Sequence, residues 1–228
     1  MRLDRYISEA LGLTRTQSKA MIQAGQVQVE GAVCKKADTQ VTDGSRVSAG
    51  GKPLGHEEFV YLMLNKPKGV VSASTDKRDP TVVDLVGDAF PRRQLFPAGR
   101  LDKDSTGFVL LTDDGAFAHE ILSPHHHVSK TYEVALDTPL TSIMVELFAR
   151  GVTLADGETM KPARLIGDES DACRCTVVLT QGVYHQIKRM FGVFGAGVNE
   201  LHRRAMGGLE LDPALEPGLL MGISSLLV

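Results

Sequence analysis

The stretch AGRLDKDSTGFVLLTDDG, residues 98–115, places two close carboxylates directly before an apolar run. The run Phe108–Leu111 predicts a strand that ends at a turn signal, so Asp102 is expected at a strand edge facing a cleft. Asp102 is then either a catalytic group or an ordinary loop aspartate paired with Arg100. If this piece is extended, Asp102 and Asp104 share a face. A glycosidase-like acid and base pair is a third interpretation, but nothing marks Asp104 for burial.

The residues on both sides of this stretch alternate between strand and helix patterns. Strands are predicted at FVYLMLNKPKG (59–69), KTYEVAL (130–136) and CRCTVVLTQG (173–182), and helices at AFAHEIL (116–122), TSIMVELFARG (141–151) and HQIKRMFGVFG (185–195). No Gly-x-Gly-x-x-Gly follows a strand, and no phosphate-loop motif is present. The pattern predicts an α+β domain on a mixed or largely antiparallel sheet with flanking helices.

The N-terminal segment has a different pattern. Two short helices are expected over 3–11 and 14–24, the second capped by Thr14 and stopped by Gly25. Alternating stretches at 26–33 and 39–49 then predict strands with turns at Glu30-Gly31 and Asp43-Gly44. The Gly-rich segment 49–58 is expected to be a linker. The predicted division is a small α/β module over 1–55 and a larger body over 59–228.

Charge supports this division. The whole chain carries −3, yet residues 1–55 hold eight Lys/Arg and five Asp/Glu, which is +3 and leaves −6 for the remainder. A basic module joined to a more acidic body indicates a polyanionic partner, although a chance fluctuation in a solvated face explains the same numbers.

Other features set limits on the class of protein. No apolar run approaches the ~20 residues that span a bilayer, and MRLDRYISEA has no secretory h-region, so no membrane partner and a cytoplasmic location are expected. Three cysteines are too few for a disulfide framework. Consecutive His125–His127 point to different sides of a strand, and Cys173 and Cys175 lack a second ligand pair at zinc spacing. We therefore expect no metal.

Two further residue groups have alternative interpretations. Tyr132, on an alternating strand, is either a packing residue or a platform on which a base stacks. In the helix after His185, Ile187 and its apolar neighbours form a core face. Lys188 and Arg189 lie off that face, either solvated or directed toward a carboxylate or phosphate.

The segment RLDRYISEALGLTRTQSKAMIQAGQVQVEG, followed by DGSRV, resembles an S4 RNA-binding domain over about 50 residues. The resemblance implies that four basic side chains, Arg2, Arg5, Arg15 and Lys19, meet RNA phosphates. Such contacts supply affinity and salt dependence with little choice of sequence.

The ordered set LNKPKG, GRLDKDSTG, KTYEV and GVYHQIKRMF resembles pseudouridine synthases of the RsuA group over essentially the whole chain, and most closely the small-subunit ribosomal RNA enzymes of that group. The resemblance implies that Asp102 is catalytic and that Tyr132 lies against the target base. It also implies that Lys188 pairs with the catalytic carboxylate and that Leu201 packs under the tyrosine. Arg100 is assigned to the RNA on the same basis, and Arg189 is grouped with the RNA-binding residues.

The implied reaction turns a uridine of 16S ribosomal RNA into pseudouridine. It changes no oxidation state and imports no group, so no cofactor is expected, and the enzyme is expected to act as a monomer. The alternatives are a synthase acting on large-subunit RNA, a non-catalytic RNA-binding factor of ribosome assembly, and a hydrolytic nucleoside glycosidase. Whether Asp102 acts as a nucleophile or removes a sugar proton stays open.

Overall fold

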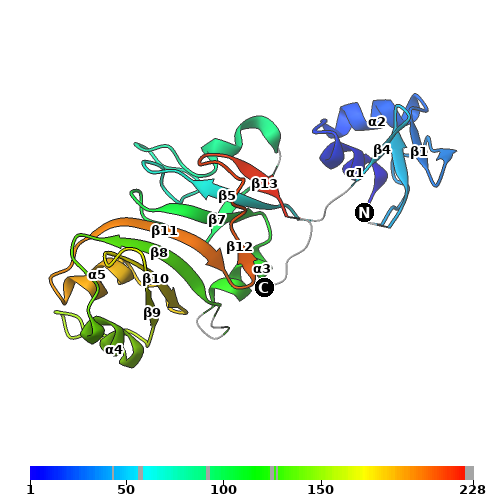
Figure 1. Cartoon of the computed structure of the whole chain (residues 1–228). Helices are drawn as coiled ribbons and strands as arrows, with labels where there is room; N and C mark the ends of the chain where they lie inside the picture. The colour runs from blue at the N-terminus through cyan, green and yellow to red at the C-terminus, as the bar shows by residue number, and fades with distance from the viewer. Residues whose placement is uncertain (43, 56–58, 91–92, 124–125, 127, 224–228) are drawn as a thin grey trace. The chain divides into compact units, whose positions relative to one another are not determined.

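The computed structural model describes residues 1–223 except 43, 56–58, 91–92, 124–125 and 127. It divides into two compact units. Unit 1 comprises residues 1–60 with 87–94, and unit 2 comprises residues 61–86 with 95–228 (Figure 1). No helix among the described residues is long and apolar enough to cross a membrane.

Unit 1 holds two helices and a small antiparallel sheet. Helices α1 (Leu3–Ala10) and α2 (Arg15–Gln23) begin and end close to where the sequence predicts. Thr14 caps α2 through a capping box with Gln17, which satisfies backbone donors that the first helical turn leaves unpaired. The four strands are ordered β2-β1-β3-β4, with bounds β1 Val27–Val29, β2 Ala32–Val33, β3 Val47–Ala49 and β4 Lys52–Leu54.

The expectation of a linker over 49–58 is wrong for its first half. Residues 49–54 belong to the β3–β4 hairpin, in which Ala49 pairs with Lys52. Gly50 and Gly51 both adopt positive φ, 56° and 78°, as a two-residue hairpin turn requires. The glycines therefore mark a tight turn and not a flexible connection. Residues 56–58, and Asp43 of the predicted Asp43-Gly44 turn, lie outside the described residues.

Unit 2 is built on a sheet of nine described strands. Their order is β13-β5-β7-β11-β8-β10-β9, with β12 added to β11 and β6 added to β7. The bounds are β5 Tyr61–Lys66, β6 Phe96–Ala98, β7 Thr106–Thr112, β8 Lys130–Leu136, β9 Arg164–Gly167, β10 Arg174–Leu179, β11 Val198–Met206, β12 Leu209–Glu210 and β13 Leu220–Gly222. β7 and β11 are parallel, and the other paired strands are antiparallel. The α+β class with a mixed sheet is confirmed.

Short helices flank this sheet. They are α3 Gly115–Leu122, α4 Ser142–Arg150 and α5 Gln186–Gly192. The 3-10 segment η1 Asp84–Ala89 begins in unit 2 and ends in the residues 87–94 that belong to unit 1. Asp114 caps α3 by accepting from the Phe117 amide, and Gly151 ends α4. The predicted apolar face of α5 is buried at Ile187, Met190 and Phe191. Helices α4 and α5 lie near β9 and β10, away from the β13 edge (Figure 1).

The close approach of strands β7 and β11 determines where the loop that carries Asp102 lies. Gly107 has φ of +101°, and a Cβ on it would lie 2.3 Å from the Arg203 carbonyl oxygen. Only glycine allows the two parallel strands to approach this closely. The loop before β7, which carries Asp102, is thereby fixed beside the inner strands β8 and β11.

Candidate active site

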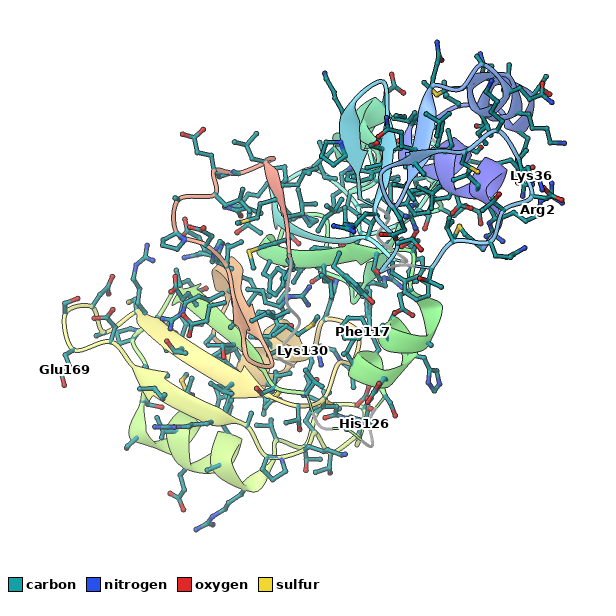
Figure 2. All side chains as sticks on the ribbon, turned by 90° about the vertical axis from the view of Figure 1, so that its right-hand side faces the viewer. Arg2, Lys36, Phe117, His126, Lys130 and Glu169 are labelled. Carbon is teal, nitrogen blue, oxygen red and sulfur yellow. The ribbon has the colours of Figure 1, made fainter. Side chains whose placement is uncertain are left out.

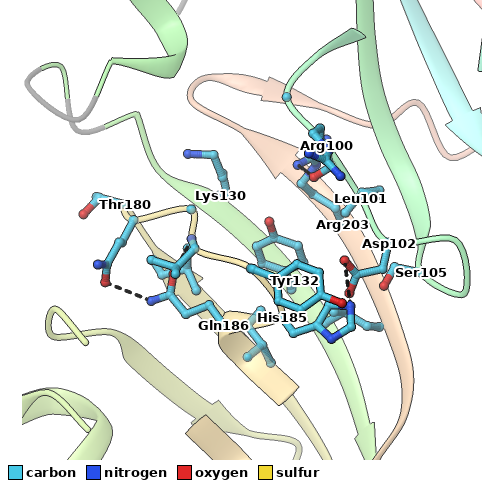
Figure 3. Close-up of a pocket in the computed structure, with 18 of the residues that line it drawn as sticks. Arg100, Leu101, Asp102, Ser105, Lys130, Tyr132, Thr180, His185, Gln186 and Arg203 are labelled. Atoms are coloured by element: carbon cyan, nitrogen blue, oxygen red, sulfur yellow. Dashed lines mark hydrogen bonds and ion pairs between the residues drawn. The ribbon is translucent and has the colours of Figure 1, made fainter. Parts of the chain in front are cut away.

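A pocket of about 580 Å³ opens in unit 2. Its walls come from the loop after β6, strands β8 and β11, and the segment 179–187 that leads into α5 (Figure 3). The pocket contains Asp102, Tyr132, Leu201 and Arg100, four of the residues that the sequence assigns to the site.

Asp102 has two basic neighbours from the start of α5. The Lys188 Nζ lies 3.4 Å from Asp102 Oδ2, and the His185 Nε2 lies 3.4 Å from Asp102 Oδ1. Asp102 and Arg100 are both described, and they form no ion pair. The structure thus pairs Asp102 with Lys188, 86 positions further along the chain, in the arrangement that the resemblance implies.

Asp104 is part of this cluster, which the sequence did not indicate. Lys188 donates to its two carboxylate oxygens at 2.8 and 2.7 Å, so Lys188 bridges both aspartates. Burial lowers the pKa of Lys188, but the Asp104 hydrogen bond and the charges of both carboxylates outweigh burial and raise it overall. The same hydrogen bond lowers the pKa of Asp104. The charged form of Lys188 is therefore favoured.

Backbone contacts hold the Asp102 loop in place. The Ser72 hydroxyl donates to the Leu101 carbonyl and accepts from the Leu101 amide, both at 3.0 Å. The fully buried Lys66 donates to the carbonyls of Ser105 at 2.6 Å and Lys103 at 3.4 Å. Burial lowers the pKa of Lys66 to about 8, although the carboxylates of Asp104 and Asp102 oppose this shift.

Arg203 supports the loop from β11. Its side chain is 1% exposed; Nε donates to the Phe108 carbonyl at 2.7 Å and Nη1 to the Arg100 carbonyl at 3.3 Å. Its Nη2 and the Ser105 hydroxyl oxygen are buried and have no hydrogen-bond partner among the described residues. Both residues also line the pocket.

Tyr132 and Leu201 form an apolar part of the pocket wall. Tyr132, on β8, is 8% exposed and Leu201, on β11, is 9% exposed. In the sheet Tyr132 pairs with Arg203, and Leu201 with the neighbouring Val134. Tyr132 lines the same pocket as Asp102 and His185 (Figure 3). Arg100, in contrast, is exposed at the pocket, where a charged partner from solvent can reach it.

Arg189 is not brought to the pocket. It forms ion pairs with Asp156 and Glu158, on the segment between α4 and β9. This placement leaves Lys188, and not Arg189, as the basic residue of α5 that faces the carboxylates.

The basic residues predicted on unit 1 are exposed. Arg2 and Arg15 share the buried Asp4, at 3.1 and 3.5 Å, and therefore lie close together. Arg5 pairs with Glu9, and Lys19 is exposed one turn beyond Arg15. Figure 2 shows Arg2 and Lys36 on one side of this unit. The ion pair of Arg5 with Glu9 is accessible to solvent and such pairs are weak, so a phosphate can compete for Arg5.

Besides Asp104, sequence reasoning missed three residues of the site, namely Lys66, His185 and Arg203. His185 could have been found, because it stands three residues before Lys188 at the start of the same predicted helix. Lys66 and Arg203 act through buried contacts with the backbone of distant segments, and no sequence spacing reveals such contacts.

Comparison with known proteins assigns the class. The sequence model of the RNA pseudouridylate synthase family matches residues 60–192, and that of the S4 domain matches residues 1–47. The chain belongs to the RNA pseudouridine synthases, which are isomerases, and carries an N-terminal S4 domain.

Individual relatives cover nearly the whole chain. An uncharacterized RNA pseudouridine synthase of Bacillus subtilis is 42% identical over 96% of this chain and 92% of its own length. The ribosomal small subunit pseudouridine synthase A of Escherichia coli K12 is 40% identical over 96% of this chain and 94% of its own. A crystal structure of a pseudouridylate synthase superposes with a TM-score of 0.68 at 37% identity, covering 98% and 96%.

Proposed function

We propose that this enzyme converts one uridine of small-subunit (16S) ribosomal RNA into pseudouridine, with Asp102 as the catalytic carboxylate. The observation that carries the proposal is the Asp102 carboxylate in a pocket between Lys188 and His185, each at 3.4 Å. The choice of RNA rests on the similarity to ribosomal small subunit synthases at 40% identity.

The reaction breaks the C1′–N1 bond, turns the uracil, and forms a C1′–C5 bond. C5 loses a proton and N1 gains one, so product and substrate are isomers and no cofactor is required. One ionised carboxylate can begin this either by attack at C1′ or by removal of a sugar proton. The Lys188 cation, 3.4 Å from Asp102, offsets part of the cost of excluding water from around the carboxylate.

The remaining pocket residues would bind the target nucleotide. The target base must leave its stack, which costs a few kcal/mol, and stacking on Tyr132 returns about 1–3 kcal/mol. Leu201 would support the ring from below. Arg100, which is exposed at the pocket, would bind a phosphate.

The S4 domain would add affinity through phosphate contacts of Arg2, Arg5, Arg15 and Lys19. Arg189 is proposed to take part only if RNA displaces its carboxylate partners. We further propose a division near residues 55–59, a monomeric enzyme, and a cytoplasmic location, where ribosomal RNA of bacteria such as the named relatives is found.

The test is chemical mapping of pseudouridine after incubation of the purified enzyme with 16S and, separately, 23S ribosomal RNA. The proposal expects one new pseudouridine in 16S RNA, no product with Asp102→Asn, and full activity with the exposed control Asp171→Asn. Product formed by Asp102→Asn would refute the catalytic assignment. Product in 23S RNA alone would show that the substrate is large-subunit RNA. If the enzyme binds RNA but forms no product, a non-catalytic assembly factor would be favoured. Release of free uracil would identify a glycosidase.

A further inference from the structure

Tyr184 stands out on the surface of unit 2 as a large aromatic residue that is 71% exposed although it lines the pocket. Its ring stacks on the neighbouring His185 ring, with centroids 3.8 Å apart and planes inclined by 16°. His185 in turn reaches Asp102 with its Nε2 at 3.4 Å. The Asp102 carboxylate, the His185 ring and the exposed Tyr184 ring therefore follow one another from the pocket to solvent.

The backbone is shaped for this row. His185 has φ of 51° and ψ of 30°, the left-handed region that residues other than glycine rarely adopt. It is the residue before α5, yet its side chain makes no capping hydrogen bond to that helix. Unusual backbone conformations of this kind concentrate at functional sites. Here the conformation presents two aromatic rings at the pocket instead of closing the helix end.

Two cations flank the same opening. Arg100 and Lys161 both line the pocket and are exposed, and neither forms an ion pair among the residues that the structure describes. Exposed cations beside a free aromatic face match the two parts of a single RNA strand, since phosphates bind the cations while an unstacked base lies on the ring.

We propose that Tyr184 is a stacking platform for the unpaired nucleobase next to the target uridine, and that His185 is the back layer of this platform. The inference rests on the proposed assignment of this pocket as the catalytic pocket. When the uridine is drawn into the pocket beside Asp102, its neighbour in the strand loses a stacking partner. The exposed face of Tyr184 replaces that partner. The target would thus be chosen by an unpaired neighbouring base as well as by the uridine itself.

The competing account is that Tyr184 only holds His185 against Asp102. The two accounts differ in what happens when the neighbouring base is absent. A platform has nothing to stack on in RNA that carries an abasic ribose at that position, whereas a residue that acts through His185 is needed whether or not the base is present.

The experiment uses the full chain and a synthetic RNA fragment centred on the uridine that pseudouridine mapping identifies. Two further fragments carry an abasic ribose on the 5′ or the 3′ side of that uridine. Binding is measured by fluorescence anisotropy in the Asp102→Asn background, and isomerisation is measured by single turnover with Asp102 present. The variants are Tyr184→Ala and Tyr184→Phe. The control is Ile143→Ala on α4, a residue that is 57% exposed and does not line the pocket.

Tyr184→Ala should weaken binding of the intact fragment about fivefold to 100-fold, the range that stacking of one base supplies, while Tyr184→Phe and Ile143→Ala leave it unchanged. One abasic fragment should bind the parent enzyme with the same loss, and on that fragment Tyr184→Ala should cause no further loss. Equal losses on intact and both abasic fragments, or no loss on any, would overturn the platform. Failure of the proposed function is separate, because it is read from the products of the mapping experiment and not from binding.

Discussion

Lys188 donates to both carboxylate oxygens of Asp104, at 2.8 and 2.7 Å, and lies further from Asp102, at 3.4 Å. The cation beside Asp102, the proposed catalytic carboxylate, is therefore shared with a second aspartate that is largely exposed. Asp104 can orient Lys188 and hold it charged without contacting the substrate. This separates the two aspartates of the sequence RLDKD into different roles that mutation can distinguish.

Replacing Asp104 with Asn should reduce isomerisation by less than about tenfold, whereas Asp102→Asn should abolish it. Lys188 loses its closer partner but keeps Asp102.

The expected stability loss is below ~1 kcal/mol, because the Asp104 carboxylate is mostly exposed. Folding lowers the pKa of Asp104. Its contribution to the free energy of unfolding is therefore present at pH values above the ordinary pKa of a carboxyl group and is lost as the pH falls below them. Urea unfolding at neutral and acid pH measures this. Equal inactivation by both substitutions would instead indicate a catalytic pair.

Removing the Lys188 charge should have a larger effect on catalysis. Lys188→Met is expected to lower kcat by roughly 100-fold, because the cation 3.4 Å from the Asp102 carboxylate is gone. Lys188→Arg keeps the charge and two donors and should restore most activity. A Lys188→Met enzyme with the parent kcat would show that the cation does not act on the carboxylate.

Gly107→Ala should unfold or severely destabilise the enzyme. The new Cβ would lie 2.3 Å from the Arg203 carbonyl oxygen, so β7 and β11 would have to separate beneath the site. Gly157 is a matched control, since its φ of +87° is also positive but nothing lies within 4 Å of a Cβ there. We expect Gly157→Ala to cost about 1 kcal/mol, mostly backbone strain, and Gly107→Ala several times as much. Urea midpoints and slopes compare the two; similar costs would contradict the close-approach account.

The local elements were predictable because their signals are local. The strand after Asp102, the helices of unit 1 and the apolar face of α5 follow from periodicity and capping residues, and the structure confirms them. Strand β11 was not predicted from its pattern, although it is the longest described strand of the sheet. Its stretch VNELHRRAM places charged residues on the strand, and Arg203 faces the interior. Because a buried position of this strand holds an arginine, the alternation of apolar and polar residues that predicts a strand is absent here.

Contacts between residues far apart in the chain could not be predicted from the periodicity of the sequence. The bridge from Lys188 to two aspartates joins α5 to the loop before β7, and sequence motifs suggested only the Asp102 half of it. At Gly50-Gly51 the sequence suggested a flexible linker where the structure has a hairpin turn. Glycine is common in both, so its presence alone does not tell them apart. Only the pairing of Ala49 with Lys52 distinguishes them.

Charge reversal on unit 1 should weaken RNA binding without altering the catalytic pocket. Arg15→Glu with Lys19→Glu removes two proposed phosphate contacts, so the slope of log affinity against log salt should become shallower by about 1.4–1.8. The same charge change at Arg150 and Arg164, exposed positions outside the pocket, is the control and should change affinity little. Filter binding over a salt series gives both slopes. An unchanged slope for the Arg15 and Lys19 variant would remove these residues from the RNA interface.

The buried Lys66 should make stability depend on alkaline pH. Burial lowers its pKa to about 8 from the ordinary value of 10.5, so between these values the unfolded chain binds more protons than the folded one. Stability from this group therefore rises with pH across that window, by up to about 3 kcal/mol, as the cost of burying a charge is relieved.

Lys66→Met should be less stable than the parent at every pH, because the Ser105 and Lys103 carbonyls lose their donor. The deficit should widen from pH 8 to pH 10, while exposed Lys68→Met should follow the parent curve throughout. Urea unfolding of the three proteins at several pH values measures the difference, and a Lys66→Met deficit that shrinks or stays constant with pH would show that Lys66 is not held as a buried cation.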